Sequence, residues 1–142
     1  MRLEHANLTV RNIDTSLKYY EALFGFKKRW EGTATGEVGP VRALHAGDEH
    51  TYLAMFEAER EELSQSDYGI AGVNHIGFEV DDLETYRKRL DELGCSIHLE
   101  ADYSPGKRIY FVDPDGIEIE LVEYEKQRFR SARRGHPQGG LL

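Results

Sequence analysis

Cysteine and long apolar runs are almost missing from this sequence of 142 residues. The single cysteine, Cys95, excludes an internal disulfide, and without partner thiols it indicates no thiolate zinc site. No apolar run approaches the ~18 residues that a membrane helix needs. No basic segment followed by an apolar one opens the chain. We therefore expect a protein that neither spans a membrane nor is secreted, with the cytoplasm as its location.

Positive charge is also scarce. The chain has 18 Lys and Arg residues against 26 Asp and Glu residues, and its net charge is −8 at pH 7. Binding to nucleic acid or to an anionic membrane requires clustered Lys and Arg, so both are disfavoured as partners. The one basic stretch lies within residues 126–142, which also contain a glycine-rich segment. We expect a mobile tail there.

The sequence repeats itself. Residues 3–26 resemble residues 73–96, because each copy begins with the apolar alternation of a strand and continues with a helical pattern. We expect the first helix to be capped by Asp14 and to end before Gly25, and the second to end at Gly94. The apolar positions of the two strands form one face each: Ala6, Leu8 and Val10, and Ile76, Phe78 and Val80.

Three shorter strands are expected after each helix: residues 26–35, 41–46 and 51–57, and residues 95–100, 107–112 and 117–124. A turn signal, Asp113-Pro114-Asp115-Gly116, precedes the last of them. Each half therefore has the order β-α-β-β-β. The first module covers residues 1–57, a linker covers 58–72 and the second module covers 73–125. We expect no more than two helical turns in the linker, which is rich in Glu and Ser.

This order predicts an α+β fold. A four-stranded sheet with one helix buries only one of its two faces. Two βαβββ modules joined edge to edge form a curved mixed sheet around a cavity, with the helices outside. His5 and His75 each open the first strand of a module and lie opposite the helix-packing residues. Both are therefore expected to point into the cavity.

A carboxylate is expected beside the two histidines. Apolar residues of the last strand alternate with acidic ones: Ile117, Ile119 and Leu121. Because this apolar set packs on the helix, Glu120 faces the cavity. Its counterpart in the first module is Ala54, which cannot bind a metal, and Glu57 lies on the other face. A lone strand His or Glu is more commonly solvated, but two His at the same repeat position favour a metal site formed by His5, His75 and Glu120.

These residues carry a family resemblance that covers about residues 3–125. His5 and His75 open the first strands, and Asp113-Pro114-Asp115-Gly116 leads to Ile119-Glu120-Leu121. This pattern resembles the vicinal oxygen chelate superfamily, which includes glyoxalase I, extradiol dioxygenases, fosfomycin-resistance thiol transferases and bleomycin-resistance proteins. The resemblance implies one divalent metal ion (Fe, Mn, Ni, Co or Zn) on the three ligands. It also implies a small-molecule substrate chelated through adjacent oxygens.

Ala54 is a departure from part of that superfamily. Glyoxalase I and the epimerases use a fourth ligand, a Glu, at this place, whereas dioxygenases and thiol transferases resemble the three-ligand set. Chains of this length in the superfamily commonly form homodimers and build each site from two chains. We therefore predict a metal-dependent enzyme, dioxygenase-like or lyase/transferase-like. The alternative is a metal-free small-molecule binding protein of the bleomycin-resistance type.

Other side chains are candidates for roles beside the metal. Glu79 is a candidate general base, although a solvated strand residue is the simpler interpretation. Five residues are candidates for substrate binding: Tyr52, Phe56, Tyr103, Lys107 and Arg108. Their simpler interpretations are plain packing for the aromatic residues and surface charge for the basic ones. His50 and Glu57 stay open as additional ligands.

Overall fold

The computed structural model describes residues 1–63 and 67–125, and the predicted tail at 126–142 lies outside the described residues. The first module contains β1 (His5–Val10), α1 (Ile13–Phe24), β2 (Lys27–Thr35), β3 (Pro40–Gly47) and β4 (Tyr52–Glu57). The second contains β5 (His75–Glu79), α2 (Leu83–Glu92), β6 (Leu99–Tyr103), β7 (Gly106–Val112) and β8 (Glu118–Tyr124). The order β-α-β-β-β is therefore confirmed in both halves. No helix among the described residues is long and apolar enough to cross a membrane.

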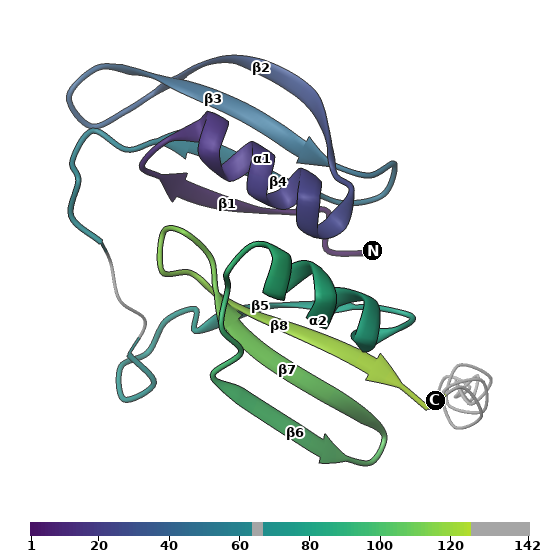
Figure 1. Ribbon diagram of the computed structural model, residues 1–142. Helices are drawn as coiled ribbons and strands as arrows, with labels where there is room; N and C mark the ends of the chain where they lie inside the picture. The colour runs from purple at the N-terminus through teal and green to yellow at the C-terminus, as the bar shows by residue number, and fades with distance from the viewer. Residues whose placement is uncertain (64–66, 126–142) are drawn as a thin grey trace, which may run out of the picture.

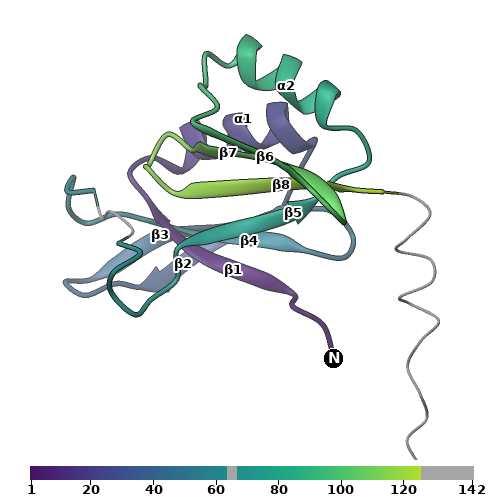
Figure 2. The same ribbon diagram turned by 90° about the horizontal axis from the view of Figure 1, so that it is seen from below.

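Each module forms its own four-stranded mixed sheet. The strand orders are β1-β4-β3-β2 and β5-β8-β7-β6. The pairs β1–β4 and β5–β8 are parallel, and the other pairs are antiparallel. Figures 1 and 2 show β1 and β5 at neighbouring edges of the two sheets, with both helices on the same side. The predicted fold class is confirmed. The two sheets keep separate ladders within the described chain.

Strand alternation builds one shared core beneath the helices. Val10 and Met55 of the first module and Phe111 and Leu121 of the second are fully buried in a single cluster. Complete burial of such a side chain contributes about 1.5–3 kcal/mol. The predicted parity is confirmed, because Leu121 faces the helices and the intervening Glu120 lies on the opposite face. We call the sheet faces opposite the helices the outer faces. They are the faces that the sequence predicts to line the cavity.

Local capping sets the helix ends. The side chain of Asn12 accepts a hydrogen bond from the Thr15 amide (2.9 Å), so the prediction that Asp14 caps α1 is wrong. Asp14 lies in the first helical turn, where its carboxylate suits the helix dipole. Gly25 and Gly94 have φ values of +70° and +66°, a conformation that favours glycine, and both predicted helix ends are confirmed.

The predicted Asp113–Gly116 turn joins the two modules. The hydroxyl of Tyr20 donates to Asp113 (2.6 Å), and the Ser16 hydroxyl donates to Asp115 (3.1 Å). The backbone amide and Nε of Arg11 also donate to Asp115, at 3.0 and 3.1 Å. Burial raises the pKa of Asp113 above its ordinary value, against the lowering effect of its hydrogen bonds.

The strand expected at 95–100 differs most from its prediction, because it is β6, Leu99–Tyr103. The strand expected at 107–112 is β7, which begins one residue earlier, at Gly106, after a two-residue connection at 104–105. A two-residue hairpin lets Tyr103 pair with Gly106 directly, so β7 begins four residues before Tyr110. No helical turn is present in the linker residues that the structure describes, 58–63 and 67–72.

Candidate functional site

His75 and Glu120 meet on the outer face of the second sheet. They lie on the adjacent strands β5 and β8, and Nε2 of His75 is 3.0 Å from Oε2 of Glu120. The His75 side chain is 32% exposed and that of Glu120 is 15% exposed, so the pair is accessible from the open face. The register explains this meeting, because Glu120 pairs with Gly77, which follows His75 on the same face of β5.

Two neighbours on β7 hold the other oxygen of Glu120. The Tyr110 hydroxyl donates to Oε1 at 3.0 Å, and Nε of Arg108 lies 3.1 Å from the same oxygen. Burial, together with the bond to Glu120, raises the pKa of Tyr110 to about 12. The phenol therefore stays protonated near neutral pH and keeps donating. This anchoring leaves Oε2 directed at His75.

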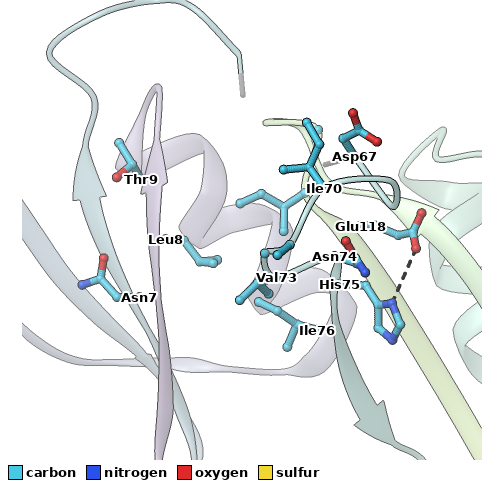
Figure 3. A pocket seen from close by; sticks show the side chains of 14 residues that line it. Asn7, Leu8, Thr9, Asp67, Ile70, Val73, Asn74, His75, Ile76 and Glu118 are labelled. Carbon is cyan, nitrogen blue, oxygen red and sulfur yellow. Dashed lines mark ion pairs between the residues drawn. The ribbon is translucent and has the colours of Figure 1, made fainter. Parts of the chain in front are cut away.

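A second set of contacts fixes the other side of the His75 ring. Nδ1 of His75 lies 3.1 Å from the hydroxyl of Tyr68, which also donates a short hydrogen bond to Glu118. The other oxygen of Glu118 is 3.3 Å from Nε2 of His98. Figure 3 shows His75 and Glu118 as an ion pair, with 3.7 Å between Nδ1 and Oε1. Both ring nitrogens of His75 therefore have defined partners.

The outer face of the first sheet has a different character. Its rings lie in a row that we call the aromatic ladder, stacked from His5 through Tyr52 to His45 and tilted between His45 and Trp30. Successive ring centroids are 4.8, 4.7 and 4.9 Å apart. The guanidinium of Arg29 lies over Tyr52 at 4.7 Å. Burial, helped by the nearby His5 and Arg29, lowers the pKa of His45. Ala54 carries no ligand atom at the position that Glu120 has in the second sheet.

A single chain keeps His5 away from His75. The edge strands β1 and β5 run in opposite directions side by side (Figure 2). His5 borders a hollow of about 350 Å³ together with Glu79, at the far end of β5. His75 borders another of about 480 Å³ together with Asn7 and Thr9 (Figure 3). Glu79 lies four positions after His75 on β5, about 13 Å along the extended chain.

The structure therefore assembles two of the three predicted ligands. Within residues 1–63 and 67–125 of one chain, no three His, Cys, Asp or Glu side chains gather in a group that can hold a metal ion. His5 lies on the outer face of its own sheet, 42% exposed at its side chain, and contacts Glu4 at 3.1 Å. The three-ligand site stays a prediction, and it requires His5 from another chain.

The other predicted residues divide between the two sheets. Tyr103, Arg108 and Glu79 line a concavity of about 570 Å³ beside His75 and Glu120. Tyr52 belongs to the aromatic ladder of the first sheet, and Phe56 is half-buried four residues further along β4.

Three predicted candidates lie away from the concavity. Lys107 is directed away from it and lies 3.9 Å from Asp102. His50 is exposed in the turn before β4, and its amide bonds Asp48. Glu57 lies 3.9 Å from Arg42, on the face that the sequence predicts.

Sequence reasoning missed Tyr68, His98 and Tyr110. Tyr110 shares the strand parity of Arg108, so alternation in the strand expected at 107–112 was a sufficient signal. Tyr68 and His98 come from irregular segments, whose side-chain directions follow no period.

Comparisons with known proteins agree with this architecture. Residues 2–121 match the model of the "Glyoxalase/Bleomycin resistance protein/Dioxygenase superfamily". The chain is 30% identical to the glutathione transferase FosA of Serratia marcescens over 145 residues, covering 99% of this chain and 93% of that protein. It is 32% identical to a lactoylglutathione lyase of Neisseria meningitidis over 129 residues, covering 87% of this chain and 91% of that protein.

A solved structure shares the fold. A variant of the fosfomycin resistance protein FosX from Listeria monocytogenes, complexed with Mn(II) and 1S,2S-dihydroxypropylphosphonic acid, superposes with a TM-score of 0.69 at 18% identity. The match covers 91% of this chain and 97% of that one. At this identity the likeness concerns the fold alone.

Proposed function

Because the chain belongs to the glyoxalase/bleomycin resistance protein/dioxygenase superfamily, we propose that it is a metal-dependent enzyme with transferase-like or lyase-like activity. Its substrate is a small molecule that binds the metal through two adjacent oxygens. The observation that carries the proposal is the meeting of His75 Nε2 and Glu120 Oε2 at 3.0 Å on an open sheet face. The named relatives, a glutathione transferase and a lactoylglutathione lyase, support these two reaction classes.

The donor set fits a divalent transition metal. An imidazole nitrogen and a carboxylate oxygen converge here, and a second imidazole completes a set that suits Mn, Fe, Co, Ni or Zn. The FosX variant of the same fold was solved with Mn(II), one member of this set. When bound, such an ion supplies Lewis-acid stabilisation of negative charge on a substrate oxygen.

Residues of the chain prepare the site. Arg108 and Tyr110 hold Oε1 of Glu120, so its Oε2 keeps its direction toward His75. Tyr103 and Tyr124 flank Arg108, whose guanidinium lies 4.4 and 5.9 Å from their ring centroids. These rings form an apolar wall beside the ligands, which excludes water from one side of a bound substrate.

A second copy of the chain is part of the proposal. In a homodimer, the outer face of one chain's first sheet covers the outer face of the other chain's second sheet and brings His5 to His75 and Glu120. The charges of the two faces are complementary. The first carries the Arg29 guanidinium beside the imidazoles of His5 and His45, and the second carries the carboxylates of Glu79, Glu118 and Glu120, with Arg108 bound to Glu120. With Ala54 at the fourth place, three protein ligands leave positions for both substrate oxygens.

Metal content tests this function directly. Wild-type protein purified from cells grown without added metal is analysed by elemental mass spectrometry, beside His75→Ala and the matched control His50→Ala. His50 is exposed in a turn and lies outside the proposed ligand set. We expect a stoichiometric divalent metal in the wild type and the control, and its loss in His75→Ala. A folded wild-type dimer without metal contradicts the proposal and favours the metal-free binding protein.

A further inference from the structure

Tyr68 connects the linker to the second sheet. Its hydroxyl contacts two groups at once, Nδ1 of His75 at 3.1 Å and a carboxylate oxygen of Glu118 through a short hydrogen bond. The side chain of Glu118 is only 16% exposed, and its second oxygen lies 3.3 Å from His98. Both oxygens of Glu118 are therefore held, and Tyr68 is the bridge between this carboxylate and the imidazole.

Proton counting gives the direction of the bonds on the Tyr68 side of the ring. A phenol has one proton to donate, and an ionised carboxylate only accepts, so the Tyr68 proton points to Glu118. The Tyr68 oxygen must then accept from Nδ1–H of His75. In the neutral ring, Nδ1–H leaves Nε2 with a lone pair.

The contact of the other ring nitrogen shows why the tautomer matters. Nε2 of His75 lies 3.0 Å from Oε2 of Glu120. Two lone pairs at this separation repel each other unless a cation or a proton lies between them. A lone pair kept on Nε2 is ready for a metal ion. A proton kept there donates to Glu120 and must be displaced before a metal binds.

We propose that Tyr68 and Glu118 are positioning residues that hold His75 in its Nδ1–H tautomer and so keep Nε2 as a metal-binding atom. This inference rests on the proposed metal-dependent function and extends its site into the linker. The linker then has a chemical role, because it supplies the acceptor that fixes the tautomer of a ligand on β5.

Two substitutions remove the two hydrogen-bond acceptors separately. Tyr68→Phe deletes the acceptor of the Nδ1 proton. Glu118→Ala deletes the acceptor of the phenol proton, so Tyr68 turns its hydrogen toward Nδ1 and the imidazole proton moves to Nε2. The matched control is Tyr86→Phe, which removes a phenol oxygen on α2, where the ring packs against Phe24 and Arg89.

The decisive readout is the 15N spectrum of the histidine rings in the metal-free protein. It is recorded at about pH 8.5, where an ordinary imidazole is neutral, and His75 is assigned with His75→Ala. We expect the Nδ1–H share of His75 to fall in Tyr68→Phe and further in Glu118→Ala, and to stay unchanged in Tyr86→Phe. Calorimetric titration with Mn(II) should show affinity about tenfold or more weaker in the two site variants, as for other residues that orient a ligand.

The outcomes separate this inference from the proposed function. If the wild type binds no metal, the proposed function is wrong, and the spectra still decide whether Tyr68 sets the tautomer. If the wild type binds metal but Tyr68→Phe keeps both the wild-type tautomer and the wild-type affinity, only the inference is overturned. Unchanged thermal unfolding of Tyr68→Phe excludes misfolding as the cause of any loss.

Discussion

On the outer face of the first sheet, His5 stacks on Tyr52 and the neighbouring strand carries Ala54. On the outer face of the second sheet, His75 lies beside Glu118 and meets Glu120. The registers are the same, because His5 pairs with Tyr52 as His75 pairs with Glu118. One backbone plan therefore presents rings in one module and carboxylates in the other. Among the described residues neither face gathers three metal-binding side chains, and in the proposed dimer each face supplies what the other lacks.

The largest expected effect compares two histidines of the aromatic ladder. His5→Ala should lose the bound metal, since in the proposed dimer His5 is the ligand supplied to the partner's half-site. His45→Ala, one ring further along the ladder, should keep it. Elemental analysis of both purified dimers checks this. Full metal content in His5→Ala shows that the second sheet binds its ion without the first.

The second-largest effect is expected on stability, from substitutions in the turns before β4 and β8. Asp113 accepts from buried Tyr20 and from two backbone amides, whereas Asp48 accepts from two amides of an exposed turn. We expect Asp113→Ala to lower the free energy of unfolding by about 2–4 kcal/mol and Asp48→Ala by about 1 kcal/mol. Urea unfolding measures both. Equal losses contradict the view that only the second turn joins the modules.

A smaller effect is expected from hydroxyl groups on the two faces. Tyr110→Phe removes a donor to Glu120, and Tyr52→Phe keeps the stacked ring while its hydroxyl makes no such bond. Metal affinity should fall about tenfold in Tyr110→Phe and stay at the wild-type level in Tyr52→Phe. A competition assay with a metal indicator dye measures the two values. Weakening of similar size in both variants argues that the ladder, too, orients the ion.

The smallest effect concerns pH. Burial raises the pKa of Asp113, so the folded state binds its proton more tightly than the unfolded state does. Its favourable contribution is complete below the unfolded pKa and is lost as pH rises through the folded one. The stability of Asp113→Asn relative to the wild type should therefore increase as pH rises above about 3.9, the ordinary pKa of an Asp side chain. Urea midpoints at several pH values check the slope, and a decrease contradicts the assignment.

The sequence predicts much of this fold because alternation is a local property. The faces of β1, β5 and β8 follow from a period of two, so His5, His75 and Glu120 fall on the outer faces as expected. Helix ends at Gly25 and Gly94 are equally local, since few residues other than glycine adopt positive φ. The family resemblance is confirmed by the match over residues 2–121.

The rest depends on tertiary placement. Whether the ligands meet depends on how β1 and β5 lie against each other, and no period encodes that relation. The linker was predicted as a connection only, yet Tyr68 contacts His75 through a direction that its sequence neighbours do not specify. The error at Lys107 has a simpler cause. Lys107 and Arg108 are neighbours on β7, so alternation places only one of them, Arg108, at the concavity.

The central claim is that one site needs two chains. It is tested by a heterodimer of one chain with His5→Ala and another with Glu120→Ala, purified through two different affinity tags. Neither variant alone has an intact site, but the heterodimer joins His5 of one chain to His75 and Glu120 of the other. We predict metal-free homodimers and a heterodimer with about half of the wild-type metal content. A heterodimer that binds no metal contradicts the account.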